Sequence, residues 1–424
     1  MGPVVVFTLL TYVCMKSLRS PHVGVIGYYG FALLQPEWNW RWSLPPGFQY
    51  QKFIAASTLI GFLVVGFQGN QFVGIVARSS LAIGGFLALA FISAASSIEP
   101  DATAFYMDNL WKIVLMAVLG IRLIDSPGKV LALMWVLVLA QGYNAYQINL
   151  EYFEDGHSSY AYRNFGDKGD NNVYSILTVP LIACSLSLAL YAERGWQKAV
   201  AATIALLQVH EIMLFESRGC MLGCLPMLAV FVWLMPKTRR TVTVLAAMLI
   251  MGAILAGPPV VEEFASAFAE EGERDSSAEG RFGLWQAGFE ITKDYPVLGV
   301  GPYAGQYLVP AYFPGGLDQH AKGLHNLFFE ISTGCGLPAL VCYLAFFAYP
   351  AIACYGTAQA TNADRWHRCA SLAVVPGLVG YWTSSMFSSG ALSESSYACA
   401  VVGVCATAIG GRMLEEARAE YDGT

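Results

Sequence analysis

The sequence predicts an all-α polytopic membrane protein with about 12–13 transmembrane helices and one long, partly helical extracytoplasmic loop. Three observations predict this class. The chain is 56% hydrophobic and only 13% charged, well below the roughly 25% charged residues of average soluble domains. Apolar stretches close to the length that crosses a bilayer recur along the chain. A single long polar segment, residues 258–326, interrupts them.

The apolar stretches define the candidate spans in chain order. They are Val4–Met15, His22–Leu34, Phe53–Phe67, Ser79–Ser97, Leu110–Leu123, Val130–Tyr146, Val173–Tyr191, Ala199–Phe215, Cys220–Leu234, Val242–Leu255, Leu327–Cys354, Ala370–Phe387 and Ser396–Ile409. Since lipid offers no partner for backbone polar groups, each span is expected to be helical. We treat residues 1–424 as one transmembrane domain, into which residues 258–326 are inserted as a loop or lid, called the long loop below.

Basic residues fall on alternate loops, and this distribution predicts the orientation of the spans. The groups are Lys16 with Arg19, Arg78, Arg122 with Lys129, Arg194 with Lys198, Lys237 with Arg239 and Arg240, Arg365 with Arg368, and Arg412 with Arg418. Because cytoplasmic loops carry an excess of Lys and Arg, we expect all these groups on the cytoplasmic side. The opposite side then receives Gln35–Lys52, Ile98–Asn109, Gln147–Asn172, Glu216–Gly219 and the long loop.

The long loop is rich in aromatic residues, which predicts an ordered segment rather than a disordered one. Ser276–Glu279 fits a capping box, S-x-x-E, ahead of a helical pattern. Phe282, Trp285 and Phe289 then recur on one helix face. We expect this helix to end just before Pro296, because the residue before a proline disfavours the helical conformation.

Four polar side chains, far apart in the sequence, map to the side opposite the basic loops: Arg163, Arg218, Arg281 and His325. Arg281 falls in the first turns of the predicted helix, where free N–H groups and the helix dipole attract anions. Each residue also has a structural interpretation. An arginine at a span end often snorkels to the interface, and a surface pair between Arg281 and Glu279 contributes only about 0.3–0.5 kcal/mol. Convergence of the four on one side favours a functional site.

Other polar positions are weighed in the same way. Glu330 follows His325 within an apolar span, and an intramembrane carboxylate indicates a functional site unless it only orients His325 or bonds a neighbouring helix. For His210-Glu211 we favour a structural role. His320 competes weakly with His325, because no helix fixes it. The segment Gly299–Gly301 is interpreted as a turn, since no strand–helix phosphate motif surrounds it.

Metal, disulfide and nucleic-acid chemistry are not indicated. The ten cysteines lie mostly inside apolar spans without a C-x-x-C pair or a Cys/His cluster. Asp101, Asp108, Asp167 and Asp170 are loosely spaced and form no D-x-D pair, so we expect no metal and no other cofactor. A net charge of −6 without a basic patch argues against nucleic acid as a partner.

Several of these residues also stand in segments typical of one family. The segments are Arg163 with Asp170–Asn172, the Ser217–Gly219 turn, Arg281–Trp285 with Tyr295–Gly301, and His325-Asn326 followed by Glu330 and Gly334–Pro338. With them, about residues 160–338 resemble the O-antigen ligase/O-antigen polymerase family of membrane glycosyltransferases. The N-terminal stretch SLRSPHVGVIGYYGFALLQPEWNW also resembles the exosortase-associated O-glycosylation ligase subgroup.

The resemblance implies a GT-C-like fold in a bacterial inner membrane, with an active site that faces the periplasm. It implies metal-independent transfer of a glycan from a polyprenyl-diphosphate carrier to the free hydroxyl of a lipid, glycan or protein acceptor. The residues it implies as catalytic are His325, for the acceptor hydroxyl, and Arg281 and Arg163, for the diphosphate. The substrate-binding residues we expect are Arg218, Asn326, Glu330, Trp285 and Asn172.

The chemistry of these residue types fits that reaction. A lipid diphosphate is a competent leaving group, and guanidinium groups stabilise the charge that develops on it without a metal. A histidine with a pKa near 6.5 is suited to take the proton of a sugar hydroxyl, and direct attack predicts inversion at the anomeric carbon. Three alternatives stay open: a polymerase of the same family, a small-anion transporter, and a scaffold that binds a partner through the aromatic face of the long loop.

Overall fold

The computed structural model of the chain describes residues 2–158, 171–239, 241–243, 245–248, 250–251, 276–360 and 362–422, with only the backbone of 276–279. Throughout these residues the chain forms helices and no strand, which confirms the all-α class. The helices are α1 Gly2–Ser17, α2 Pro21–Leu34, α3 Pro36–Asn39, α4 Tyr50–Val64, α5 Gly74–Ala94, α6 Pro100–Leu123, α7 Pro127–Asp155, α8 Asn171–Tyr191, α9 Gly195–Leu214, α10 Arg218–Leu234, α12 Ser276–Asp294, α13 Gly305–Tyr312, α14 Leu327–Cys335, α15 Leu337–Gln359, α16 Arg365–Ser385 and α17 Glu394–Asp422.

The described helices agree with a polytopic membrane protein. Five of them, α5, α6, α8, α15 and α17, are long and apolar enough to cross a membrane. The shorter apolar helices α1, α4 and α10 overlap three further predicted spans. The predicted span Val242–Leu255 lies partly outside the described residues.

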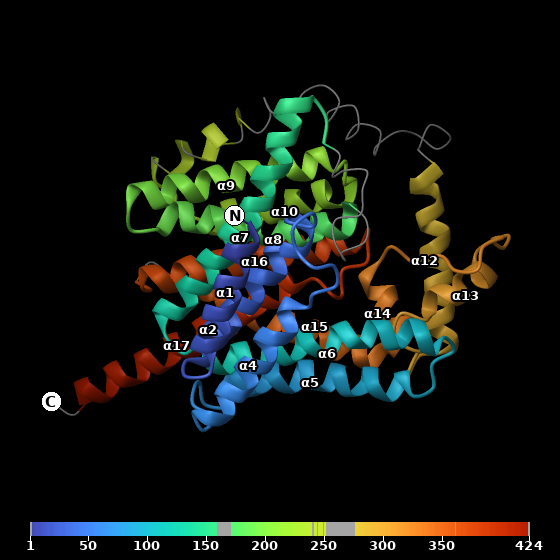
Figure 1. Ribbon diagram of the computed structural model, residues 1–424, viewed down its shortest axis with the longest axis horizontal. Coiled ribbons are helices and arrows are strands. Elements are labelled where there is room, and N and C mark those ends of the chain that lie inside the picture. Colours follow the sequence, from blue (N-terminus) through green and yellow to red (C-terminus); the bar gives the residue numbers. More distant parts are fainter. Residues whose placement is uncertain are drawn as a thin grey trace.

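Helices α5 and α6 run side by side along one edge of the molecule, and α15 packs against α5 (Figure 1). Helix α8 is buried along most of its length and packs against α16, α9 and α10. A helix that is apolar all round is expected in such a central position. The N-terminal end of α8 therefore has a fixed place relative to its neighbours.

Helices α10 and α16 approach each other closely because small residues face the contact. A Cβ on Gly223 would lie 2.0 Å from Ser384 Oγ, and a Cβ on Gly219 would lie 2.5 Å from Phe387 Cβ. Such spacing of glycines lets membrane helices pack backbone to backbone. The approach brings the start of α10 against the connection that follows α16.

The described part of the long loop is folded, as the aromatic content predicts. Helices α12, α13 and α14 gather at the right of Figure 1, and α14 packs against α5. One small apolar cluster is buried here. Its members are Leu284, Ala287 and Ile291 of α12, Val309 of α13, and Leu324 just before α14. On the outside of this cluster Tyr312 donates a 2.7 Å hydrogen bond to Asp294, whose carboxylate raises the pKa of Tyr312 to about 12.

Helix α12 has the predicted bounds but buries a different face from the aromatic one. It begins at Ser276 and ends at Asp294, in agreement with the capping-box and proline signals. Phe282 and Phe289 are 62% and 58% exposed, so most of the aromatic stripe does not pack inward. The buried face is the aliphatic one, because Ala287 and its neighbours fit closely against α13 and α14.

The predicted span Leu327–Cys354 is not one helix, and this prediction is wrong. The chain breaks at Gly336, whose φ of +85° suits glycine. A Cβ at Gly336 would lie 2.1 Å from the Val297 carbonyl oxygen, so the long loop packs directly into the break. Pro338 lies in the first turn of α15, which runs from Leu337 to Gln359 with Pro350 inside it. Helix α14 is consequently not among the candidate spans.

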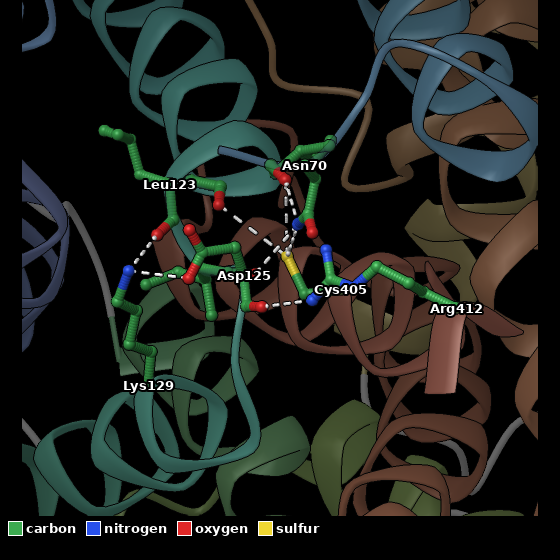
Figure 2. Close-up of polar contacts among 9 residues, drawn as sticks. Asn70, Leu123, Asp125, Lys129, Cys405 and Arg412 are labelled. Carbon is green, nitrogen blue, oxygen red and sulfur yellow. Dashed lines mark hydrogen bonds and ion pairs between the residues drawn. The ribbon is translucent and has the colours of Figure 1, made fainter. Parts of the chain in front are cut away.

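Loops that the charge pattern predicts on the cytoplasmic side contact one another. Figure 2 shows the cluster around the turn between α6 and α7. The Asn70 side chain donates to two carbonyl groups at the C-terminal end of α6, at 2.8 and 2.9 Å. Lys129 pairs with Asp125 at 2.6 Å, and Arg412 of α17 donates to the Asp125 carbonyl oxygen at 2.7 Å. These contacts satisfy helix-end carbonyls that would otherwise lack partners.

A buried polar network joins α7, α8 and α9 and supports the structural interpretation of His210-Glu211. Glu211 is fully buried and accepts hydrogen bonds from Gln141 at 2.7 Å and from Thr178 at 3.2 Å. His210 is hydrogen-bonded to Asn149 of α7. Buried polar groups with partners of this kind fix the register of the helices that carry them.

Candidate functional site

A cavity of about 200 Å³ lies where the end of the long loop meets α14 and the connection between α16 and α17. Its lining residues are Val173, Tyr303, Gly305, Gln306, Gly323, Leu324, His325, Glu330, Thr333, Ser388 and Ser389. Two residues that the sequence predicts for the site, His325 and Glu330, therefore share one cavity. Asn172 precedes the lining residue Val173 at the start of α8.

His325 is held by the backbone on both sides of it. Its φ is +46°, a conformation that residues with a Cβ adopt rarely. The flanking residues Leu324 and Asn326 are each 4% exposed, so they anchor this conformation. Strained backbone of this kind persists where the surrounding structure enforces it, often at functional sites. The imidazole is thus positioned at the cavity by its anchored neighbours.

Asn326 serves as the N-cap of α14. Its side-chain oxygen accepts hydrogen bonds from the backbone N–H groups of Phe328, at 2.9 Å, and Phe329, at 3.2 Å. Its amide nitrogen donates to the Met386 carbonyl oxygen at 3.1 Å. The side chain is thereby engaged with the protein backbone on both ends. This geometry supports a positioning role for Asn326 beside His325, and its contact with substrate stays a prediction.

Glu330 lies one turn into α14 and is linked to α6, and through it to the long loop, by two aromatic residues. Tyr106 of α6 donates a 3.1 Å hydrogen bond to Glu330 Oε1, and the Tyr106 ring stacks on Tyr303 with centroids 5.4 Å apart. Burial of the carboxyl raises the pKa of Glu330 to about 7. Its second oxygen, Oε2, is buried and has no hydrogen-bond partner of good geometry among the described residues, while the Ser389 hydroxyl also interacts with the carboxyl. Glu330 and Ser389 both line the cavity.

Arg218 stands at the first position of α10, next to the start of α8. Asn171 donates to the Phe215 carbonyl oxygen at 2.6 Å, and Ser217 donates to Asn172 at 2.8 Å. These bonds fix the turn that carries Arg218 to the helix end that carries Asn172. Asn172 therefore holds the turn together, and its neighbour Val173 reaches the cavity.

Arg281 and Trp285 lie one turn apart on the same face of α12. The Trp285 ring lies 5.9 Å from the Phe387 ring, and Phe387 also packs against Gly219 at the start of α10. Phe387 thus connects the helix of Arg281 with the helix of Arg218. The Trp285 indole N–H is buried and has no hydrogen-bond partner in the described part of the chain.

Some predicted residues fall elsewhere, and others were missed. Arg163 lies outside the described residues. His320 is exposed, packs on Tyr307 and does not line the cavity. This agrees with the expectation that it competes only weakly with His325 for a role in the site. Sequence reasoning missed Tyr106, Ser388 and Ser389. The polar run after Phe387, SSGALSES, is the sequence signal that could have revealed the two serines.

A comparison with protein families bears on these elements. Residues 205–344 match the model of the O-antigen ligase family. This match supports membership of the O-antigen ligase/polymerase family, which agrees with the resemblance seen in the sequence. No curated protein matches the chain. The match also supports a glycosyltransferase-type membrane enzyme.

The region that matches the O-antigen ligase family contains most of the predicted site. Arg218, Arg281, Trp285, His325, Asn326 and Glu330 fall within it. Asn172 and the two cavity serines lie outside it, yet the fold joins them to the same place. The predicted site therefore includes elements that precede and follow the matched region.

Proposed function

We propose that this family member is a metal-independent, inverting glycosyltransferase of the O-antigen ligase type. It transfers a glycan from a polyprenyl-diphosphate carrier to an acceptor hydroxyl on the periplasmic side of a bacterial inner membrane. The observation that carries the proposal is the cavity shared by His325 and Glu330 inside the region that matches the family.

In this proposal His325 takes the proton from the acceptor hydroxyl as that oxygen attacks the anomeric carbon. The bond between the anomeric carbon and the diphosphate oxygen breaks, and the electron pair leaves with the diphosphate. Attack from the opposite face inverts the anomeric configuration. A base that titrates near neutral pH is matched to this task, and the anchored backbone of His325 supports it.

Arg281, Arg218 and Arg163 stabilise the leaving diphosphate in the same proposal. Guanidinium groups form bidentate, charge-assisted hydrogen bonds with phosphate oxygens. The contact of Phe387 with both Trp285 and Gly219 supports the approach of the first two arginines to one region. Charge stabilisation of this kind typically contributes a factor of about 10²–10³ to the rate.

Transfer by the purified protein tests the proposal. The assay combines a polyprenyl-diphosphate-linked glycan with an acceptor saccharide in the presence of EDTA. We expect wild-type transfer, a loss of about 10²–10⁴-fold in His325→Ala, and a loss of about 10²–10³-fold in Arg281→Ala. The matched controls are His320→Ala, an exposed histidine on the same loop, and Arg78→Ala on α5.

Full activity in His325→Ala would overturn the role of this histidine, provided that the variant elutes as a folded protein. Loss of wild-type transfer in EDTA would overturn metal independence. NMR of the product reports the anomeric configuration, and retention would overturn direct attack. A product lengthened by many repeats, instead of a single transfer, would identify a polymerase in place of a ligase.

A further inference from the structure

The connection between α16 and α17, residues 386–393, forms one wall of the cavity. Its residues Ser388 and Ser389 line the cavity together with Glu330. The connection lies outside the region that matches the O-antigen ligase family. Neither serine takes part in the mechanism proposed above, so their presence beside His325 needs its own explanation.

This wall is rigid although it is not helical. Tyr381 donates a 3.0 Å hydrogen bond to the Gly390 carbonyl oxygen, and Tyr397 donates a 3.0 Å hydrogen bond to that of Ala391. Both tyrosines are fully buried. Asn326 holds the other end through the Met386 carbonyl oxygen. Hydroxyl groups on such a backbone are preorganised for a ligand, which lowers the entropy that binding costs.

Two buried polar atoms at the cavity have no hydrogen-bond partner among the described residues. They are Glu330 Oε2 and the hydroxyl oxygen of Ser388, a residue that is only 3% exposed. Leaving a buried polar group without a hydrogen bond destabilises the folded protein. Polar atoms of this kind therefore indicate that a polar ligand or ordered water supplies the missing partners.

We propose that the cavity binds a single sugar ring through its hydroxyl groups, with Glu330, Ser388 and Ser389 as the hydrogen-bonding residues. This proposal rests on the proposed function and specifies which part of its substrates occupies the cavity. A carboxylate oxygen accepts from sugar hydroxyls, while a serine hydroxyl both donates and accepts. The cavity volume of about 200 Å³ is smaller than that of pockets for drug-sized ligands, roughly 300–1,000 Å³, and suits one ring.

The charge of Glu330 distinguishes a sugar from a diphosphate. Above its pKa of about 7 the Glu330 carboxyl is ionised and repels phosphate at close range, most strongly where water is excluded. The diphosphate is therefore kept on the side of the arginines, and the neutral ring enters beside Glu330. The ring has two possible sources, the first sugar of the donor glycan or the terminal sugar of the acceptor.

Equilibrium binding to the full chain in nanodiscs tests the proposal with three probes. They are polyprenyl diphosphate carrying one N-acetylhexosamine, bare polyprenyl diphosphate, and a lipopolysaccharide core oligosaccharide. We expect Ser388→Ala to weaken binding of one sugar-bearing probe by about 2- to 10-fold, and Glu330→Gln by about 10- to 100-fold. Binding of the bare carrier is expected to stay unchanged in Ser388→Ala.

The probe whose binding weakens in the variants identifies the source of the sugar ring. Weaker binding of the sugar-bearing carrier alone identifies the donor sugar, and weaker binding of the oligosaccharide alone identifies the acceptor sugar. Ser385→Ala is the matched control, because Ser385, the last residue of α16, is also buried but does not line the cavity. If Glu330→Gln does not fold, Ser388→Ala and Ser389→Ala still decide the result, because each removes only one oxygen atom.

Failure of this inference is separable from failure of the proposed function. Equal affinities of wild type, Ser388→Ala, Ser389→Ala and Glu330→Gln for both sugar-bearing probes would overturn the sugar site, even if the wild type transfers glycan. Absence of binding by both sugar-bearing probes would overturn it too. Conversely, a specific loss of affinity in Ser388→Ala with no transfer by the wild type would support the sugar site and overturn the proposed function.

Discussion

Two residues that line the cavity, Tyr303 and His325, hold backbone angles that cost L-amino acids free energy. Their φ angles are +66° and +46°. A non-glycine residue in this region typically costs on the order of 1–3 kcal/mol unless its surroundings enforce it. Here stacking on Tyr106 and the N-cap bonds of Asn326 provide the enforcement. The strain is thus localised at residues that line the cavity.

The charge state of Glu330 gives a prediction at the level of one residue. Burial raises its pKa to about 7, whereas an exposed glutamate titrates near 4.3. The folded protein therefore binds this proton more tightly than the unfolded chain does. The resulting stabilisation is complete below about pH 4 and is lost as the pH rises through about 7.

We accordingly expect the unfolding temperature of the wild type to fall between about pH 5 and pH 8 by more than that of Glu330→Gln, which cannot ionise. Thermal unfolding of both proteins in the same detergent, followed across this range, measures the difference. Glu290→Gln, an exposed position on α12, serves as the control. Parallel curves for wild type and Glu330→Gln would contradict the raised pKa.

Among the elements, α10 and α16 are fitted to each other by glycine. A Cβ at Gly223 would lie 2.9 Å from the Ser384 backbone nitrogen and 3.0 Å from the Gly380 carbonyl oxygen, so the helices must separate to admit it. We expect Gly223→Ala to destabilise the protein by about 1–3 kcal/mol through overpacking. The same change displaces the turn of Arg218, so transfer activity is expected to fall as well.

The control for this prediction is Gly84→Ala in α5, where an added Cβ meets open space. Alanine is the better helix former by about 0.8–1.0 kcal/mol, so that variant is expected to be at least as stable as the wild type. Thermal unfolding and glycan transfer measure both variants. Equal stability of Gly223→Ala and Gly84→Ala would show that the α10–α16 contact can accommodate an added methyl group without strain.

The elements also show what sequence reasoning could and could not establish. The bounds of α12 follow from local signals, since Ser276 and Pro296 mark its ends. The break at Gly336 depends on a long-range contact with Val297, which apolar run length does not reveal. The buried face of α12 was missed for a related reason. The aliphatic residues of α12 pack into a small buried cluster, whereas periodicity alone predicts burial of the bulkier Phe282 and Phe289.

For the site, sequence reasoning found the residues whose chemistry is conspicuous. His325 and Glu330 stand out because charged or titratable groups are rare in apolar stretches. Ser388 and Ser389 did not stand out, because serine is common in loops and only the fold places these two at the cavity. Only the structure brings residue 388 beside residue 330.

At the scale of the whole molecule, the distribution of basic loops predicts which end faces the cytoplasm. Arg412 and Lys129 meet at Asp125, as loops on one side should. On the other side, Ile98 and Thr103 bond the backbone of the long loop at Val300 and Pro302. These contacts support a consistent two-sided arrangement, and the compartment at each end stays a prediction.

Cysteine labelling in intact cells tests that prediction. We expect Asp318→Cys, on an exposed part of the long loop, to react with a membrane-impermeant maleimide added outside the inner membrane. Glu416→Cys on α17 is expected to react only after the membrane is opened. The parent protein, whose native cysteines are buried or half-buried, measures the background. Labelling of Glu416→Cys in intact spheroplasts, with protection of Asp318→Cys, would reverse the orientation.

The break between α14 and α15 restricts how substrates reach the cavity. The segment from Pro296 to Gly301 donates from Val300 to Thr333 and from Gly301 to Gly334, and accepts from Leu337 at the Pro296 oxygen. A flap that swings open there would sever all three bonds together and expose the glycines on both sides. Any hinge therefore lies outside that segment. Any opening that admits a ligand to the cavity is therefore expected elsewhere, while the stretch next to the break stays shut.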